Sequence, residues 1–179
     1  MSRPSKFLAK VLRHEPDLID IQLDRHGWVQ VDELLRKLKK VGHGLSKDEL
    51  RHIVETNDKK RFSISEDGRR IRAAQGHSIE VDLGLPATRP PETLYHGTAS
   101  QNLDKIFEGG LDPGRRRQVH LSPDPETATR VGRRHGKPIV LRVDARRMHA
   151  DGWTFFCSDN GVWLTDAVPA EYLGFGVTQ

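Results

Sequence analysis

Cysteine is almost absent from this sequence. Its only cysteine is Cys157, and no Cys-x-x-Cys pair occurs. An intrachain disulfide and the common cysteine-based zinc sites are therefore excluded. The nine histidines are scattered along the chain and form no His-Glu-x-x-His motif, so we expect no bound metal.

Long apolar runs are also missing. No segment approaches the ~20 apolar residues that a membrane-spanning helix needs. The first ten residues, MSRPSKFLAK, show neither the apolar run nor the cleavage site of a signal peptide. We therefore expect a soluble, cytoplasmic protein with no membrane partner. No coiled-coil repeat is visible, so nothing in the sequence predicts more than a monomer.

The common nucleotide and nucleophile motifs are lacking as well. Neither G-x-G-x-x-G nor G-x-x-x-x-G-K-[ST] occurs, and no serine nucleophile elbow is present. Cys157 lies in the apolar run WTFFCS, which favours burial over reactivity. The chain does have a mild basic excess, with 29 Lys and Arg against 25 Asp and Glu. This charge permits an anionic partner but is far below that of a tail that binds nucleic acid by charge alone.

The proline-rich segment GLPATRPPET divides the chain. Such a segment is stiff and non-helical, so we predict domains over residues 1–83 and 93–179 joined by a linker over 84–92. In the first domain, helical patterns occur in SKFLAKVL, in DELLRKLKK and after Ser46, whose S-x-x-E spacing to Glu49 is a capping box. A short strand is predicted in GWVQV, and RFSIS and RRIRAA flank an Asp-Gly turn. Three helices followed by a hairpin predict a winged-helix-like lobe.

The second domain is richer in strands. TLYHGT, QVHLS, PIVLRVD and the hairpin WTFFCS/GVWLT have strand patterns, and NLDKIFEGG and ETATRVGRRHG have the patterns of short helices. The paired glycines of NLDKIFEGG predict a helix C-cap. We therefore predict an α+β protein of two lobes, the second built on a mainly antiparallel sheet.

Arginine and histidine recur at places that suit phosphate. Arg13 and His14 stand where the first helix ends, and a helix C-terminus favours cations by ~0.3–1 kcal/mol without any function. An arginine also offers a planar fork to phosphate oxygens, and a histidine can donate a hydrogen bond or move a proton near pH 7. Arg61 at a strand start and the triplet 115–117 before VHLS are either solvated charges or phosphate contacts.

A second group of polar residues lies at predicted strands of the second domain. His96 and Thr98 flank Gly97, which permits close approach of a ligand to the backbone. His120 should leave the face formed by its apolar neighbours in QVHLS. The residues alone predict a two-lobed protein with several phosphate-binding positions and identify no cofactor.

Taken in order, the segments LRHEP, KKRF, YHGT, RRRQVHLS, RHGKPIVLRVD and NGVWLTDAVPAEYL resemble the KptA-type RNA 2′-phosphotransferases, and the resemblance covers nearly the whole chain. It implies an N-terminal winged-helix RNA-binding lobe and a C-terminal ADP-ribosyltransferase-like lobe that binds NAD as co-substrate. The implied reaction removes an internal 2′-phosphate from tRNA-like RNA without a metal. The phosphate attacks the nicotinamide ribose and expels nicotinamide, and a transesterification then releases 2′-hydroxyl RNA and ADP-ribose cyclic phosphate.

The resemblance also implies roles for individual residues. It places the catalytic set on Arg13, His14, Arg61 and Arg116, and the NAD-binding residues on His96, Gly97, Thr98, His120 and Ser122. Arg116 is chosen because it lies three residues before VHLS, although the triplet leaves Arg115 and Arg117 as alternatives. The arginines would neutralise one shared 2′-phosphate, and His14 would move a proton.

Two other functions remain open from the sequence. The same fold could transfer ADP-ribose to a terminal phosphate, a protein or a small molecule, which a screen of acceptors would reveal. A non-enzymatic winged-helix nucleic-acid binder would release no nicotinamide. The helix SKDELRHIVETN has three acids against two Lys and Arg, which argues against tight duplex binding.

Overall fold

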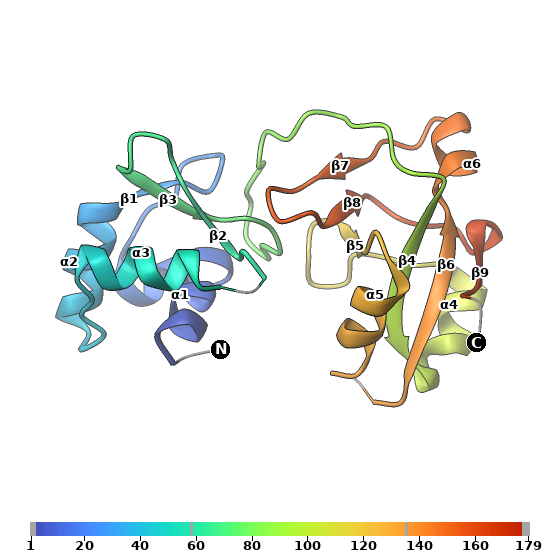
Figure 1. The fold of residues 1–179 in the computed structure, drawn as a ribbon, viewed down its shortest axis with the longest axis horizontal. Helices are drawn as coiled ribbons and strands as arrows, with labels where there is room; N and C mark the ends of the chain where they lie inside the picture. Colours follow the sequence, from blue (N-terminus) through green and yellow to red (C-terminus); the bar gives the residue numbers. More distant parts are fainter. Residues whose placement is uncertain (1–2, 58, 135, 177–179) are drawn as a thin grey trace. The chain divides into compact units, whose positions relative to one another are not determined.

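The computed structural model describes residues 3–57, 59–134 and 136–176. The chain forms two compact units, Met1–Gly84 and Leu85–Gln179 (Figure 1). Each unit has its own apolar core. Both units contain helices and strands, and all strand pairs in the described residues are antiparallel. The predicted mixture of helices and antiparallel sheet is thereby confirmed. No helix in the described part of the chain is long and apolar enough to cross a membrane.

The first unit combines helices with one three-stranded sheet. Its described elements are α1 (Arg3–Arg13), η1 (Pro16–Ile19), β1 (Val29–Gln30), α2 (Val31–Lys40), α3 (Lys47–Glu55), β2 (Phe62–Ile64) and β3 (Arg70–Ala73). Strand β3 lies between β1 and β2. The register pairs Phe62 with Ala73 on one side and Val29 with Ile71 on the other.

Local sequence signals explain most of these elements. Helix α1 buries Leu8, Val11 and Leu12 in the core and ends at Arg13, as its apolar stripe predicts. The capping box before α3 is confirmed, because the Ser46 hydroxyl accepts from the Glu49 amide at 3.1 Å and the Glu49 carboxylate accepts from the Ser46 amide at 2.8 Å. The strand predicted in GWVQV is shorter than expected because α2 already begins at Val31.

The second unit contains two three-stranded sheets. Its described elements are β4 (Thr93–Ala99), η2 (Ser100–Asn102), α4 (Leu103–Gly109), β5 (Val119–Leu121), α5 (Pro125–Gly132), β6 (Pro138–Asp144), α6 (Ala145–Ala150), β7 (Phe156–Cys157), β8 (Trp163–Thr165), η3 (Ala170–Tyr172) and β9 (Leu173–Phe175). The sheet orders are β4-β6-β9 and β5-β8-β7. A bridge between Tyr95 and Ser122 links the two sheets.

Helix α5 lies directly against β4 (Figure 1). A Cβ atom on Gly97 would lie 1.7 Å from the carbonyl oxygen of Ala128, and one on Gly132 would lie 2.8 Å from the carbonyl oxygen of Thr98. Only glycine lets the two backbones approach this closely. The sequence suggested that Gly97 leaves room for a ligand. In the structure, the backbone of α5 fills that space.

The segment predicted as a linker is bound to the second unit over part of its length. Ala87 forms an isolated antiparallel bridge with Phe156, and the Thr88 amide donates to the Phe155 carbonyl at 2.8 Å. The boundary between the units falls after Gly84. Residues from Leu85 onward therefore belong to the second unit.

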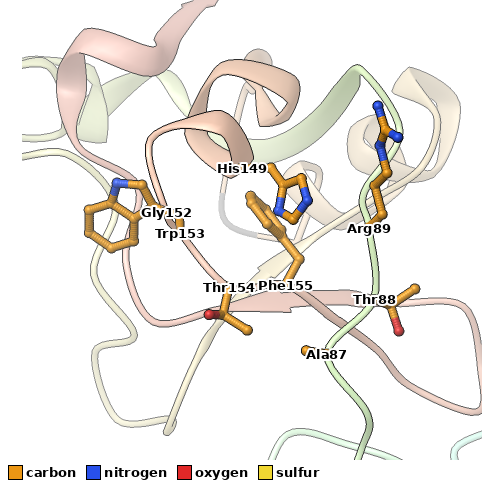
Figure 2. Close-up of a pocket in the computed structure, with 8 residues that line it drawn as sticks. All are labelled: Ala87, Thr88, Arg89, His149, Gly152, Trp153, Thr154 and Phe155. Carbon is orange, nitrogen blue, oxygen red and sulfur yellow. The ribbon is translucent and has the colours of Figure 1, made fainter.

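A pocket of about 200 Å³ lies beside this segment. Figure 2 shows its lining, which consists of Ala87, Thr88, Arg89, His149, Gly152, Trp153, Thr154 and Phe155. In Figure 2 the Arg89 guanidinium points away from the Phe155 ring. None of the residues that the sequence assigned to a site lines this pocket.

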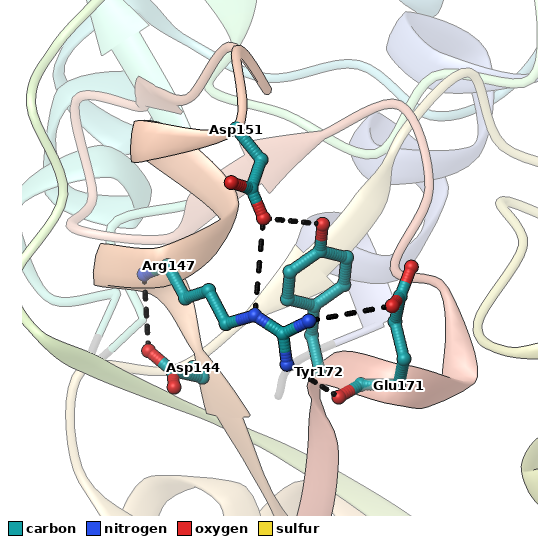
Figure 3. A network of polar contacts seen from close by, with 5 residues as sticks. All are labelled: Asp144, Arg147, Asp151, Glu171 and Tyr172. Carbon is teal, nitrogen blue, oxygen red and sulfur yellow. Dashed lines mark hydrogen bonds and ion pairs between the residues drawn. The ribbon is translucent and has the colours of Figure 1, made fainter.

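A polar network joins α6 to the segment before β9 (Figure 3). The Tyr172 hydroxyl donates to Asp151 Oδ2 at 2.7 Å, and this hydrogen bond raises the pKa of Tyr172. The Arg147 guanidinium lies 4.8 Å from the Tyr172 ring centre and 3.4 Å from a Glu171 carboxylate oxygen. The Asp144 carboxylate accepts from the Arg147 amide and caps α6. These contacts explain how a six-residue helix, which the sequence pattern did not predict, is held in place.

Candidate functional site

Ser78 forms hydrogen bonds with Arg13 and His14, the two residues at the end of α1. His14 Nδ1 lies 2.9 Å from the Ser78 hydroxyl, and the Ser78 amide donates to the Arg13 carbonyl at 3.0 Å. The last carbonyls of a helix have no partner within the helix, so Ser78 satisfies one of them while it positions the imidazole. His14 is exposed and Arg13 is half-buried. Ser78, which lies 64 positions after His14, therefore anchors the last turn of α1 and the imidazole that follows it.

His77 is a buried histidine next to these cations. Only 4% of its surface is exposed, and burial, followed by the charges of Arg13, His14 and Arg72, lowers its pKa from 6.5 to about 4. His77 is therefore neutral at pH 7. Its Nε2 is buried and has no hydrogen-bond partner among the described residues. His77 and Ser78 could not be identified from the sequence, because isolated loop residues belong to no periodic pattern.

Arg61 is held by a buried amide. Its Nη1 donates to Asn57 Oδ1 at 2.9 Å, and Asn57 Nδ2 donates to the Ser5 hydroxyl at 3.2 Å. Asn57 is 8% exposed and Ser5 is 3% exposed. Ser5 belongs to the first turn of α1, whereas Arg13 ends that helix, so the two anchoring points are about 12 Å apart along the helix axis.

In the second unit, Arg116, His120 and His96 are in direct contact. Arg116 Nη1 lies 2.8 Å from His120 Nδ1. Because a guanidinium can only donate, His120 Nδ1 must accept, so His120 carries its proton on Nε2. His96 Nδ1 in turn donates to the His120 carbonyl at 3.1 Å. Partial desolvation lowers the pKa of Arg116, yet a guanidinium remains protonated at neutral pH.

Arg115 and Arg117 lack the side-chain contact that orients Arg116 in the described residues. All three arginines are exposed, but no side-chain hydrogen bond or ion pair joins Arg115 or Arg117 to another residue in the described ranges. Of the three arginines in the triplet, only Arg116 is oriented by a site residue.

The five residues predicted to bind NAD fall into two groups. His96, His120 and Ser122 lie where β4 meets β5, since Ser122 bridges to Tyr95 in the register of the two sheets. Thr98 is 4% exposed, and its hydroxyl accepts from Asn102 Nδ2 at 3.2 Å. Gly97 faces α5. The hydroxyl of Ser122 and the guanidinium of Arg116 are donors of the kind that suits ribose and phosphate oxygens.

The described residues contain no group of three or more His, Cys, Asp or Glu side chains placed to hold a metal ion. The cysteine is half-buried, and burial together with Asp159 raises the pKa of its thiol. The thiolate, which is the reactive form, is therefore disfavoured at Cys157.

Comparison with known proteins gives a consistent result. The family model described as "RNA 2′-phosphotransferase, Tpt1 / KptA family" matches residues 1–167. A probable RNA 2′-phosphotransferase of Agrobacterium fabrum is 59% identical over 169 residues, which cover 94% of this chain and 91% of the relative. Proteins of the same description from Burkholderia pseudomallei and Streptomyces coelicolor are 53% and 54% identical and cover 97% and 96% of this chain, with 95% and 93% of their own lengths aligned. The chain belongs to the Tpt1/KptA family of RNA 2′-phosphotransferases.

Proposed function

We propose that this chain is an NAD-dependent RNA 2′-phosphotransferase, which transfers an internal 2′-phosphate of RNA to the ADP-ribose part of NAD. The observation that carries the proposal is the family match over residues 1–167, together with relatives at more than half identity that are described as RNA 2′-phosphotransferases. The winged-helix character of the first unit and the ADP-ribosyltransferase-like character of the second are part of the same proposal.

The first unit would supply the groups that bind the 2′-phosphate. Arg13 and Arg61 are assigned to its oxygens, because a guanidinium can donate two parallel hydrogen bonds to a phosphate. Asn57 supports this role by holding Arg61. Ser78 supports the assignment of His14 as the group that moves a proton, because it orients the imidazole at Nδ1.

The second unit would bind NAD and the transferred phosphate. His96, His120 and Ser122 are assigned to the ribose and phosphate groups of NAD, with Gly97 and Thr98 as the neighbouring strand positions. Arg116 is assigned to the transferred phosphate, and its contact with His120 supports this choice over Arg115 and Arg117. NAD would supply the ribose carbon that accepts the phosphate and nicotinamide as the leaving group.

The roles of the residues follow from the bonds that change. Arg61 and Arg116 would stabilise the phosphate while one of its oxygens bonds to the anomeric carbon of the nicotinamide ribose and nicotinamide leaves with the bonding electron pair. His14 would then take the proton of the adjacent ribose hydroxyl as that oxygen bonds to phosphorus. It would return the proton to the RNA 2′-oxygen as the bond between this oxygen and phosphorus breaks, which regenerates His14 and leaves 2′-hydroxyl RNA.

The arginine triplet offers an internal control for this proposal. Loss of the 2′-phosphate from a short RNA would be followed with NAD and a chelator. Removal of one preorganised donor to a transition-state charge costs ~100-fold or more in rate, so Arg61→Ala and Arg116→Ala should each lose that much. Arg115→Ala and Arg117→Ala should stay within about threefold of the wild type, because neither side chain is held by a residue of the proposed site and unpaired surface charges contribute little.

Two outcomes would contradict the proposal. If nicotinamide appears while the 2′-phosphate persists, the enzyme uses another acceptor. If Arg61→Ala and Arg116→Ala both turn over like the wild type, the assignment of the phosphate-binding residues is wrong.

A further inference from the structure

Arg61 is oriented by a neutral partner. Its guanidinium donates to the Asn57 amide oxygen at 2.9 Å, and this is the only side-chain partner of Arg61 among the described residues. We propose that Asn57 is a positioning residue that orients Arg61 while leaving its positive charge uncompensated for a phosphate dianion. The inference rests on the proposed function, because it adds a residue to the machinery that binds the 2′-phosphate.

The hydrogen bonds fix the orientation of the Asn57 amide. Two donors approach its oxygen, since Arg61 Nη1 lies at 2.9 Å and the Lys59 amide at 3.3 Å. Neither group can accept a hydrogen bond, so Oδ1 must face them and Nδ2 must face the Ser5 hydroxyl. If the amide were rotated by 180°, Nδ2 would face the Arg61 guanidinium and the Lys59 amide, and all three groups are donors.

Burial and backbone geometry make this arrangement rigid. Asn57 and Ser5 are more than nine-tenths buried. Lys60, directly before Arg61, has a φ of +39°, in the left-handed region that a residue with a Cβ rarely adopts. Its amide donates to the Asn57 carbonyl at 2.8 Å. Asn57 therefore holds the strained backbone with its main chain and the neighbouring guanidinium with its side chain.

The choice of an amide is informative because other cations of this chain bind carboxylates. Lys10 pairs with Glu15 at 2.9 Å, and Arg146 pairs with Glu92 at 2.9 Å. Aspartate has nearly the shape of asparagine, and the groups around the Asn57 amide, Arg61, the Lys59 amide and the Ser5 hydroxyl, can all donate to a carboxylate. Packing and hydrogen bonding would therefore accept Asp at position 57, but an aspartate would neutralise the charge that Arg61 brings to an anion.

The test compares Asn57→Asp with Asn57→Ala. Affinity for a short RNA with one internal 2′-phosphate would be measured by calorimetry without NAD, against the same RNA without the phosphate. A hydrogen bond to a charged group is worth ~1.5–3 kcal/mol, or roughly 10–100-fold in affinity. Asn57→Asp should lose binding in this range, because Arg61 stays oriented but is neutralised. Asn57→Ala should lose less, by roughly threefold to tenfold, because Arg61 keeps its charge and loses only its orientation.

A matched control and a second background separate positioning from a structural role. Thr56→Asp adds the same charge at the adjacent exposed position and should bind within about twofold of the wild type. In an Arg61→Ala background, Asn57→Asp and Asn57→Ala should have no further effect on affinity, because Asn57 acts through Arg61. The inference would be overturned if Asn57→Asp bound the RNA as tightly as the wild type. It would also be overturned if the Asn57 substitutions lowered the affinity as much in the Arg61→Ala background as in the wild type.

One further measurement distinguishes failure of this inference from failure of the proposed function. The side-chain Nε–H signal of Arg61 would be followed by NMR while inorganic phosphate is added. The signal should shift at lower phosphate concentration in the wild type than in Asn57→Asp. If the wild type does not prefer the 2′-phosphorylated RNA, the proposed function fails, and this titration alone then decides for or against Asn57. Indistinguishable titrations of the two proteins would reject its role.

Discussion

Replacement of Gly97 by alanine tests the contact between α5 and β4. The new Cβ would lie 1.7 Å from the Ala128 carbonyl oxygen, 2.6 Å from the carbonyl carbon and 2.9 Å from the Gly132 amide nitrogen. Ordinary contacts of a Cβ begin near 3.4 Å, so the shortest contact must lengthen by about 1.7 Å. All three atoms belong to the backbone, so no side-chain rotation can relieve the overlap.

The loss of folding free energy in Gly97→Ala should lie at the upper end of the range known for overpacking. Overpacking costs ~1–3 kcal/mol when the surroundings can adjust, and here a whole helix has to move, so we expect about 3 kcal/mol. For a unit of this size each kcal/mol lowers the melting temperature by roughly 4–8 °C, which gives a loss of about 12 °C or more. Gly109→Ala, in the last residue of α4, is the matched control because nothing lies within 4 Å of its Cβ position.

The measurement is thermal unfolding followed by circular dichroism, combined with the 2′-phosphate assay at a temperature where all variants are folded. Gly109→Ala should melt within about 2 °C of the wild type. If Gly97→Ala also melted there, α5 would not rest on β4 as described. If it melted normally and only needed more NAD for the same activity, then Gly97 would be a ligand-binding residue, as the sequence suggested.

Three further predictions concern the first unit. The wild type should lose about 3 kcal/mol more unfolding free energy than His77→Gln between pH 7 and pH 4. The reason is that the pKa of His77 is 6.5 in the unfolded chain and about 4 in the folded one, so protonation favours the unfolded chain as the pH falls from 6.5 to 4. Denaturant titrations of both proteins at pH 7 and pH 4 check this, and an equal pH dependence would contradict it. Ser46→Ala should lower the free energy of unfolding by about 1 kcal/mol through loss of the capping box, measured by urea unfolding, and an unchanged midpoint would refute the cap. Ser78→Ala should lower kcat by roughly 10-fold with KM little changed, because His14 loses its hydrogen-bond partner at Nδ1. Single-turnover rates at saturating RNA measure this, and a rate equal to that of the wild type would contradict it.

Features that depend on neighbouring residues were predictable from the sequence. The capping box at Ser46, the end of α1 at Arg13 and the glycine C-cap after α4 all follow from signals within a few residues. Strand β6 coincides with the pattern PIVLRVD, and β7 and β8 form the predicted hairpin. In each case the physical cause is local and therefore visible in the order of residues.

Features that depend on distant residues were not predictable. The support of Arg61 comes from Asn57 and from Ser5, which precedes Asn57 by 52 positions. His14 is held by Ser78, and no periodicity marks that serine. Helix α6 has too few residues for an apolar repeat and depends on its cap and on Tyr172. The need for glycine at position 97 likewise comes from the backbone of α5, which lies beside it in the fold but far from it in the sequence.

The arginines that we propose to bind phosphate were also only partly predictable from the sequence. Residue type indicated Arg13, Arg61 and the triplet 115–117 as candidates. The family resemblance selected Arg116 and left Arg115 and Arg117 as alternatives. The contact between Arg116 and His120 Nδ1 distinguishes Arg116 from its neighbours. Sequence chemistry thus proposed the class of ligand, and the tertiary contacts show which side chains are held in fixed positions.

The most direct test of the proposed function is the stoichiometry of the reaction. Wild-type protein would be incubated with a short RNA carrying one internal 2′-phosphate, with and without NAD, in the presence of a chelator. Nicotinamide release and loss of the 2′-phosphate would be quantified in the same samples. We expect one nicotinamide released for each 2′-phosphate lost, and no loss without NAD. Loss of phosphate without NAD, or nicotinamide release while the 2′-phosphate stays on the RNA, would contradict the proposed reaction.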